Sequence, residues 1–301
     1  MSDDLTYRGA GVDVEAADRL VARIAGLAAA THGPEVEPGP AAFAGLYRLP
    51  EGSLLAATCD GVGTKVLIAR EAGRFEGIGQ DLVAMNVNDL LPVGARPLFF
   101  LDYVAAGTLD PDAVTAVVAG VATACREVGC ALLGGETAEM PGLYLPGDLD
   151  VAGFAVGLVD PDRRPDPAGP RPGDRVMALP SSGVHANGLS LARAALLDRG
   201  GLRLDEHLPE LGRTVADALL EPTELYVARV LGAPPGRVGA LAHVTGGGLA
   251  RRGRAMLPEG LHMHLDRERW RRPPIFDLIE RAGPVPRSEM AATFNLGLGF
   301  L

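Results

Sequence analysis

The stretch GQDLVAMNVNDLLPVGARPLFFLDYVAAG, residues 79–107, contains two different hydrophobic patterns in succession. Apolar residues recur at helical spacing over residues 78–91, until Pro92 and Gly94 interrupt the pattern. The second part, residues 97–106, is rich in aromatic and branched side chains, which favours a β-strand. The stretch therefore predicts a helix that leads into a buried strand, as in an α/β or α+β domain, and it leaves the strand order open.

The sequence on either side repeats this alternation. The short apolar runs SLLAAT (53–58), CALLGG (130–135) and VAGFAVGLV (151–159) have the length and composition of strands. A helix rich in alanine and valine should begin after Asp110, a typical N-cap residue, and end near Gly129. The first half of the chain thus predicts one domain with several strands and at least two helices.

A proline-rich segment, DPDRRPDPAGPRPGD (160–174), follows the last of these strands. Because proline disfavours regular structure, we expect a linker here, with an N-terminal domain over 1–165 and a C-terminal α/β domain over 166–301. In the second domain we expect strands over 175–180, 260–265 and 294–301 and helices over 187–200 and 273–283. The pattern stops within a strand, so we also expect the second domain to lack its last elements.

Composition narrows the class of protein. The 301 residues carry a net charge of −10, which argues against a nucleic-acid surface, because such a surface needs clustered Lys and Arg. The three cysteines do not have the spacing of metal ligands, and no secretory signal is visible at the N-terminus. Both observations fit a reducing compartment. No apolar run reaches membrane-spanning length without interruption. We therefore expect a soluble, cytoplasmic protein that binds neither nucleic acid nor membrane.

The loop Asp60-Gly61-Val62-Gly63-Thr64-Lys65 resembles a phosphate-binding loop in composition. It does not have the spacing of a Walker A loop, in which four residues separate the first glycine from the Gly-Lys pair. Its glycines nevertheless allow close backbone approach, Lys65 supplies positive charge, and Asp60 is a candidate ligand of Mg²⁺. Taken alone, the loop fits a glycine-rich turn with surface charges equally well.

Three polar residues lie in the predicted helix that follows. Asp81 and Asn88 are seven residues apart and share a helix face, and Asp89 lies beside them. Their oxygens are suitable to join Asp60 around a hard cation. The alternative is a solvated polar stripe.

The motif GGETAEMPG (134–142) follows a predicted buried strand. In α/β folds ligands bind at the carboxyl ends of strands, so Glu136 and Glu139 are candidate metal or base groups. Gly134 and Gly135 would permit close approach. The alternative is a simple turn with exposed glutamates.

Two loops in the second domain have the same form, a strand followed by small residues and the start of a helix. SSGVHANG (181–188) offers hydroxyls, backbone N–H groups and His185, and HVTGGG (243–248) offers Thr245 and three glycines. Both suit a phosphate monoester at a helix N-terminus. His185 is a candidate proton shuttle, although a lone histidine is more often structural. His262 and His264 we interpret as surface residues.

Together these motifs resemble one enzyme family. YRGAGVDVEAADRLV, CDGVGTK, GQDLVAMNVNDLLPVGARPLFFLDYVAAG, GGETAEMPG, DVAGFAVG, SSGVHANGLSL and HVTGGG occur in this order across nearly the whole chain. The ordered set resembles the phosphoribosylformylglycinamidine cyclo-ligases, also called aminoimidazole ribonucleotide synthetases, of purine biosynthesis. Each motif alone is weak, whereas their order is highly specific.

The resemblance implies a two-domain fold, an α/β (α+β) subunit that forms a homodimer through a barrel shared by both N-terminal domains. It implies an ATP- and Mg²⁺-dependent reaction that closes the imidazole ring of aminoimidazole ribonucleotide from formylglycinamidine ribonucleotide and releases ADP and phosphate. Positioning and charge neutralisation would carry most of the catalysis, as in other phosphoryl transfers.

The motifs and the resemblance assign the residues as follows. We expect Asp60, Lys65 and His185 to be catalytic, and Asp60, Asp89 and Glu136 to bind the metal. ATP would be bound by Gly61, Gly63, Thr64, Lys65, Asp81, Asn88, Asp89, Gly134, Gly135, Glu136 and Thr137. The substrate would be bound by Ser181, Ser182, Gly183, His185, Asn187, Thr245, Gly246, Gly247 and Gly248.

Two departures from the family pattern keep alternatives open. Proline and alanine replace several glycines in HGPEVEPGPAAFAGL (32–46), so a segment that would fold over the nucleotide should be stiffer. The family also continues beyond TFNLGLGF. The alternatives are a sister ATP-using kinase or synthetase of the same fold, and a shortened, non-catalytic nucleotide-binding dimer.

Overall fold

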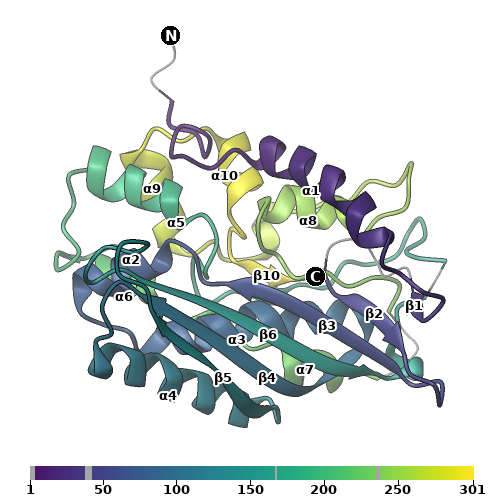
Figure 1. Ribbon diagram of the computed structural model, residues 1–301. Helices are drawn as coiled ribbons and strands as arrows, with labels where there is room; N and C mark the ends of the chain where they lie inside the picture. Colours follow the sequence, from purple (N-terminus) through teal and green to yellow (C-terminus); the bar gives the residue numbers. More distant parts are fainter. Residues whose placement is uncertain (1–3, 38–42, 167, 235–237) are drawn as a thin grey trace.

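The computed structural model describes residues 4–37, 43–166, 168–234 and 238–301, and it is built around one sheet (Figure 1). The six strands lie in the order β1-β2-β3-β6-β4-β5; β4 and β5 are parallel, and the other neighbours are antiparallel. The strands are β1 (Val36–Glu37), β2 (Gly45–Arg48), β3 (Leu54–Gly61), β4 (Ala95–Ala106), β5 (Ala131–Glu139) and β6 (Leu149–Val159). All four strands predicted in the first half are present, which confirms an α/β (α+β) arrangement.

Two helices cover one face of this sheet. Helix α3 (Glu76–Leu90) confirms the predicted helix, and α4 (Pro111–Glu127) begins after its N-cap Asp110 as predicted. The two helices cross closely because both contribute a glycine: a Cβ at Gly79 would lie 2.1 Å from the Val117 carbonyl oxygen. Helix α3 is buried along most of its length, so its polar side chains must find partners inside the protein.

The other face of the sheet exposes apolar side chains. Cys59, Phe154 and Leu101 are register partners across β3, β6 and β4, so their side chains stand on the same face. Leu101 is 36% exposed, Phe154 37% and the neighbouring Tyr103 38%. This sheet face, defined by Cys59, Leu101, Tyr103 and Phe154, has no covering layer within the part of the chain that the structure describes.

The second half of the chain packs against the end of the sheet and against α3. In Figure 1 the helices α8, α9 and α10 lie above the sheet together with α1, and α4 lies below it. The remaining α-helices are α1 (Val14–Ala29), α2 (Lys65–Ala72), α5 (Leu189–Arg193), α6 (Val215–Leu220), α7 (Val227–Leu231), α8 (Gly248–Ala255), α9 (Pro274–Ala282) and α10 (Arg287–Thr293). The other elements of the chain are the short strands β7 (Leu179–Pro180), β8 (His207–Leu208), β9 (Arg213–Thr214) and β10 (Leu298–Phe300), the 3₁₀ helices η1 (Leu91–Val93), η2 (Pro161–Arg163) and η4 (Arg267–Arg269), and the π-helix η3 (Ala194–Arg199).

Two predicted strands of the second half are largely wrong. Of residues 175–180 only Leu179 and Pro180 form a strand, paired with β10, and residues 260–265 form none. A strand needs a ladder partner, and within the described ranges residues 175–178 have none, which leaves Met177 83% exposed. The predicted helices over 187–200 and 273–283 are present as α5 with η3 and as α9, and the predicted strand over 294–301 is shortened to β10.

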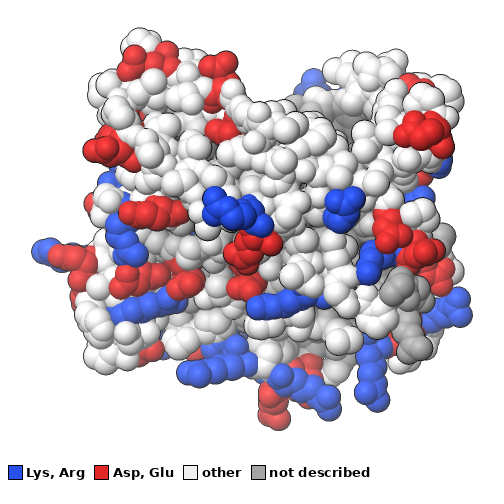
Figure 2. All heavy atoms as spheres, turned by 90° about the horizontal axis from the view of Figure 1, so that it is seen from below, with Lys and Arg blue, Asp and Glu red and all other residues white. Residues whose placement is uncertain are grey.

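The surface carries both signs of charge. On the face drawn in Figure 2, blue basic and red acidic side chains alternate without a continuous basic area. Among the residues described here, no helix is both long enough and apolar enough to cross a membrane. The stiffened segment expected over 32–46 falls partly on residues 38–42, which lie outside the described residues.

Candidate active site

Asp60 lies at the end of β3, where the sheet meets α3. The side chain of Asn86 on α3 fixes its backbone: the Asp60 N–H donates to Asn86 Oδ1 at 2.9 Å, and Asn86 Nδ2 donates to the Asp60 carbonyl at 3.1 Å. The Asp60 carboxylate accepts from the N–H of Gly61 at 2.7 Å. The carboxylate is therefore held in place at the mouth of the Gly61–Gly63 loop.

Asp89 lies on the last turn of α3, near enough to Asp60 to interact with it electrostatically. It contacts a histidine from the second half of the chain. His243 Nδ1 lies 2.8 Å from Asp89 Oδ1, and the imidazole is fully buried. His243 is positioned by backbone bonds to the last strand: Ala242 N–H donates to the Leu301 carbonyl and Val244 N–H to that of Gly299. His243 orients the Asp89 carboxylate, because one carboxylate oxygen accepts a hydrogen bond from the imidazole ring.

The charges around Asp60 are unbalanced. Burial, opposed by the Gly61 hydrogen bond and reinforced by the nearby negative charge of Asp89, raises the pKa of Asp60 to about 6. Two carboxylates in a half-buried place with too little compensating positive charge make a site that favours a cation. In the part of the chain described, no group of three or more His, Cys, Asp and Glu side chains forms a metal cluster.

The raised pKa of Asp60 predicts how stability depends on pH when no ion is bound. A carboxyl whose pKa is higher in the folded chain favours folding below pH 4, and this contribution is lost as the pH rises through about 6. We expect the stability difference between Asp60→Asn and the wild type to shift in favour of the variant by at most about 3 kcal/mol between pH 4 and pH 7. Thermal unfolding of both proteins in a chelating buffer checks this, and a difference that is constant with pH would contradict it.

The glycine loop of residues 245–248 lies beside this pair and has a conformation that requires glycine. Gly247 and Gly248 have φ of +90° and +62°, and a Cβ at Gly248 would lie 2.5 Å from the Ala291 carbonyl oxygen. Thr245 is buried, and Gly246 faces Asn187. Asn187 in turn contacts Met85 of α3 through its Nδ2, 3.6 Å from the sulfur. The predicted substrate residues Asn187 and Thr245–Gly248 are therefore brought to one place.

The first glycine loop is held against the second half as well. Gly63 has a φ of +66° and open space around it, whereas a Cβ at Gly61 would meet the Val151 carbonyl at 2.9 Å. The Thr64 and Ser190 hydroxyls lie 3.1 Å apart. The two loops thus approach the Asp60–Asp89 pair from both halves of the chain.

Lys65, Asp81 and Asn88 were predicted to bind ATP, and in the structure all three contact other parts of the chain. Lys65 and Asp81 are fully buried and form an ion pair with Nζ 2.7 Å from Oδ2. Lys65 Nζ also donates to the Glu221 carbonyl at 2.7 Å. Its ammonium group therefore does not face the open site, because both partners lie inside the protein.

The partners of these three residues form one segment, residues 221–226, which we call the clamped segment. Asp81 Oδ1 accepts from both the N–H and the hydroxyl of Thr223, at 2.8 and 2.6 Å. Asn88 holds the segment at two further points, because its side chain donates to the Glu224 carbonyl and accepts from the Tyr226 N–H. Asp81 and Asn88 are therefore not solvated in this structure; they fasten the second half of the chain to the first.

The first loop of the second half is more enclosed than predicted. Ser181 Oγ donates to Asn295 Oδ1 and Ser182 Oγ to the Pro222 carbonyl, so both hydroxyls have protein partners. Burial lowers the pKa of His185 well below its usual range, and its Nε2 accepts from the Ser182 N–H. Among described residues its Nδ1 has no partner. His185 is therefore neutral, and Gly183 lies against the side chain of Glu221.

Glu136 is not part of the Asp60–Asp89 pair. It lies on β5, three strands from β3 in the order β3-β6-β4-β5, and its register row runs through Tyr103 and Ala152 to Gly61. Strands are spaced by about 4.8 Å, so the Glu136 backbone lies roughly 14 Å from that of Gly61. Gly134, Gly135, Glu136 and Thr137 are all exposed on this edge strand. Within one chain the predicted three-carboxylate metal site does not form.

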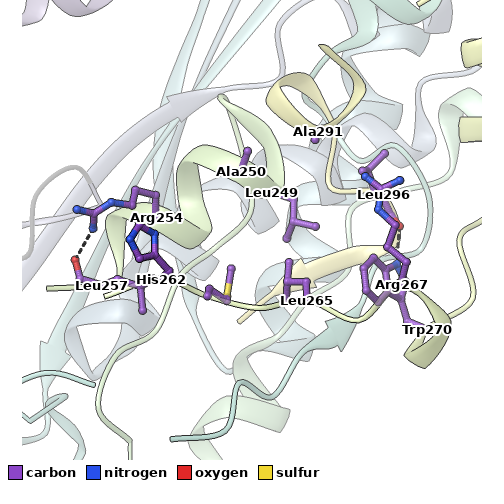
Figure 3. A pocket seen from close by; sticks show the side chains of 11 residues that line it. Leu249, Ala250, Arg254, Leu257, His262, Leu265, Arg267, Trp270, Ala291 and Leu296 are labelled. Carbon is purple, nitrogen blue, oxygen red and sulfur yellow. Dashed lines mark hydrogen bonds between the residues drawn. The ribbon is translucent and has the colours of Figure 1, made fainter. Parts of the chain in front are cut away.

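A hollow of about 360 Å³ lies elsewhere, between α8 and the segment that leads to Trp270. Figure 3 shows its apolar side chains, among them Leu249, Leu265 and Leu296, with Arg254 and His262 at the rim. His262 and His264 are exposed, as predicted. None of the predicted site residues lines this hollow.

Three further residues belong to the site and were not among those predicted from the sequence. Asn86 fixes Asp60, His243 orients Asp89, and Arg252 of α8 lies close enough to both carboxylates to interact with them electrostatically. Asn86 and His243 stand within motifs that were recognised, so a polar residue in a buried helix and a histidine before a glycine loop were the available signals. Arg252 carries no such signal.

Comparisons with known proteins agree over nearly the whole chain. Residues 42–159 match the family model "AIR synthase related protein, N-terminal domain", and residues 171–301 match the corresponding C-terminal domain. The phosphoribosylformylglycinamidine cyclo-ligase of Myxococcus xanthus is 51% identical over 98% of this chain and 87% of its own length, and that of Carboxydothermus hydrogenoformans is 47% identical over 99% and 88%.

Solved structures share the fold at lower identity. The thiamine monophosphate kinase of Aquifex aeolicus is 19% identical over 85% of this chain and 80% of its own, with a TM-score of 0.55. A structure titled AaThiL complexed with AMPPCP and TMP is 19% identical over 93% and 83%, with a TM-score of 0.62. These two show the fold alone.

Proposed function

This chain belongs to the phosphoribosylformylglycinamidine cyclo-ligase family, and from that premise we propose how its residues divide the work of the reaction. It is a ligase that uses ATP to close the imidazole ring of 5-aminoimidazole ribonucleotide from formylglycinamidine ribonucleotide in purine biosynthesis. The observation that carries the assignment of the site is the meeting of Asp60, Asp89 and both glycine loops at the junction of the two halves.

The chemistry explains the need for ATP. An amide oxygen is a poor leaving group, so it first attacks the γ-phosphorus, and the bond to the bridging oxygen breaks as ADP leaves with the electron pair. The amidine-side nitrogen then attacks the activated carbon, phosphate departs with the C–O electron pair, and the nitrogen loses a proton. The protein contributes mainly positioning and charge neutralisation.

We propose that Asp60 and Asp89 hold Mg²⁺ together with phosphate oxygens and water. Mg²⁺ commonly takes one or two carboxylates, several waters and substrate phosphates, and two carboxylates that lack compensating charge match this donor set. When bound, the ion would neutralise charge on the triphosphate. His243 keeps the Asp89 carboxylate in one orientation, and Asn86 does the same for the backbone of Asp60.

The glycine loops would bind the nucleotide and the ribonucleotide phosphate. Gly61, Gly63 and Thr64 form the wall nearest Asp60, and Asn187 with Thr245–Gly248 forms the wall from the second half. We propose that Lys65, Asp81 and Asn88 act indirectly, by holding the clamped segment so that the two walls face each other. His185, neutral and enclosed, would position the Ser182 backbone rather than shuttle protons.

We also propose that the chain forms a homodimer through the apolar sheet face of Cys59, Leu101, Tyr103 and Phe154. Such contiguous exposed apolar surface commonly marks an interface, and two such faces would close a barrel. This arrangement also gives Gly134–Thr137, on the neighbouring strand, a place near a second chain. The domain boundary near residue 165 and a reducing, cytoplasmic location, which the three free cysteines support, remain part of the proposal.

A charge on the sheet face should separate the dimer. We expect Phe154→Glu to give a monomer at micromolar concentration, because two carboxylates would be buried without partners at the interface. Thr123→Glu, which places the same charge on the exposed side of α4, should leave the dimer unchanged. Sedimentation velocity of wild type and both variants measures this, and a monomeric wild type or a dimeric Phe154→Glu would refute the proposed interface.

The function itself is tested by turnover. With ATP and formylglycinamidine ribonucleotide we expect ADP and aminoimidazole ribonucleotide in equal amounts, and with thiamine monophosphate we expect no ADP above background. The second substrate is the informative comparison, because kinases of this fold exist for it. Turnover of thiamine monophosphate alone would assign the chain to those kinases instead.

A further inference from the structure

Arg252 lies on α8, in the turn that follows the second glycine loop. Its Nε donates to the Gly246 carbonyl at 3.1 Å, and its guanidinium lies 5.2 Å from the centroid of the Phe43 ring. Arginine held by one hydrogen bond and one ring face keeps a fixed plane and leaves its remaining N–H groups free to bind. Those Nη groups have no hydrogen-bond partner among residues that the structure describes.

The charges that act on Arg252 are those of the site. The interacting groups include Asp89 and Asp60, yet no nitrogen of Arg252 lies within 4.0 Å of either carboxylate. Arg252 therefore interacts with the two carboxylates electrostatically without forming an ion pair with either of them. Arg252 is also half-buried, so an anion that reached it would be partly shielded from water, where ionic contacts are stronger.

Lys65 does not fill this role. It was the sequence-based choice for neutralising phosphate, and it is fully occupied by Asp81 and the Glu221 carbonyl. Of these two basic residues, Arg252 alone keeps N–H donors without a partner among the described residues, and it interacts electrostatically with both carboxylates. A phosphate that reached Asp60 and Asp89 without a neighbouring cation would be repelled by both of them.

We propose that Arg252 binds the γ-phosphoryl group of ATP and stabilises it during transfer, with its N–H fork on the non-bridging oxygens. This inference rests on the proposed ATP-dependent ring closure and names a residue for it. A triphosphate fits better than the monoester of the substrate, because the triphosphate arrives with its own divalent cation and so tolerates the two carboxylates. Arginine contacts to a phosphoryl group in transfer raise kcat by roughly 10³–10⁵ in other phosphoryl-transfer enzymes.

The test compares Arg252→Gln and Arg252→Lys with Arg251→Gln as the matched control. Arg251 is the preceding residue on the same helix, but it is exposed and pairs with Asp18 at 2.6 Å. Calorimetry with Mg²⁺ and either ADP or AMPPCP separates the γ-phosphate from the rest of the nucleotide. Steady-state kinetics gives kcat and the KM for each substrate, and thermal unfolding shows that each variant is folded.

We expect Arg252→Gln to weaken AMPPCP binding about tenfold or more, to leave ADP binding within twofold, and to lower kcat by roughly 10² or more. Arg252→Lys should recover part of the loss, and Arg251→Gln should match the wild type. Equal effects on ADP and AMPPCP, no effect on either, or a change confined to the KM for the ribonucleotide would overturn the proposal. A different outcome would reject the proposed function instead: Arg252→Gln weakens AMPPCP binding but not ADP binding, while the wild type makes no aminoimidazole ribonucleotide.

Discussion

Asp60→Asn is expected to abolish ATP-dependent formation of aminoimidazole ribonucleotide while the protein stays folded. The substitution keeps an acceptor for the Gly61 N–H, so the loop retains its hydrogen bond. It removes one of two carboxylates proposed to hold Mg²⁺, and electrostatic groups of this kind contribute on the order of 10²–10³ to kcat. Because the carboxylate is unfavourably buried, the variant should be at least as stable as the wild type near pH 7.

Asp102→Asn is the matched control for this experiment. Asp102 lies on β4 in the same register row, since both Asp60 and Asp102 pair with Gly153 of β6. Burial raises its pKa too, but it interacts with Cys125 rather than with the site. The coupled assay for product, run beside thermal unfolding, should show activity in Asp102→Asn and none in Asp60→Asn. Full activity in Asp60→Asn would remove Asp60 from the site.

Breaking the buried pair of Lys65 and Asp81 should have the largest effect on stability. Removing one partner of a buried ion pair leaves an uncompensated charge, which destabilises proteins by about 3–5 kcal/mol. Lys65→Met should therefore lower the free energy of unfolding by that amount, and Asp81→Asn should do so as well. In the double variant both charges are gone, and the amide introduced by Asp81→Asn still has Thr223 as a partner. The double variant should therefore recover more than half of the unfolding free energy that Lys65→Met loses.

The control for this experiment is an ion pair on the protein surface. Arg74→Gln breaks the ion pair of Arg74 with Asp217, whose side chains are 49% and 36% exposed, and it should change stability by less than about 1 kcal/mol. Urea unfolding of the four variants and the wild type provides the comparison. If Lys65→Met were as stable as Arg74→Gln but failed to bind ATP, Lys65 would belong to the phosphate site after all.

Local patterns predicted the fold of the first half because its elements satisfy themselves locally or within one sheet. The helix over 78–91 and the strands around it carry clear periodicity, and Asp110 caps α4 as expected. The strand expected over 175–180 shows the limit of such reasoning. Its composition favours a strand, but pairing decides whether the strand forms, and pairing depends on residues far away in sequence.

The sequence predicted which residues meet at the site, and the roles it assigned to them stay predictions. Asp60, Asp89, Asn187 and the 245–248 loop do meet, as the ordered motifs indicated. Glu136 could not be excluded from sequence, because only the strand order places it across the sheet. The contact of Lys65 could not be predicted for a related reason: a lysine in a glycine-rich loop is typical of a phosphate ligand, and its buried partner lies 16 residues later.

The most direct measurement follows the oxygen atom that ATP is proposed to activate. Formylglycinamidine ribonucleotide carrying a heavy oxygen isotope in its amide group is incubated with the protein, Mg²⁺ and ATP, and the phosphate released is analysed by mass spectrometry. We expect one heavy oxygen in each phosphate, formed together with one ADP and one aminoimidazole ribonucleotide. Unlabelled phosphate beside the ring-closed product, or ADP release without ring closure, would contradict it.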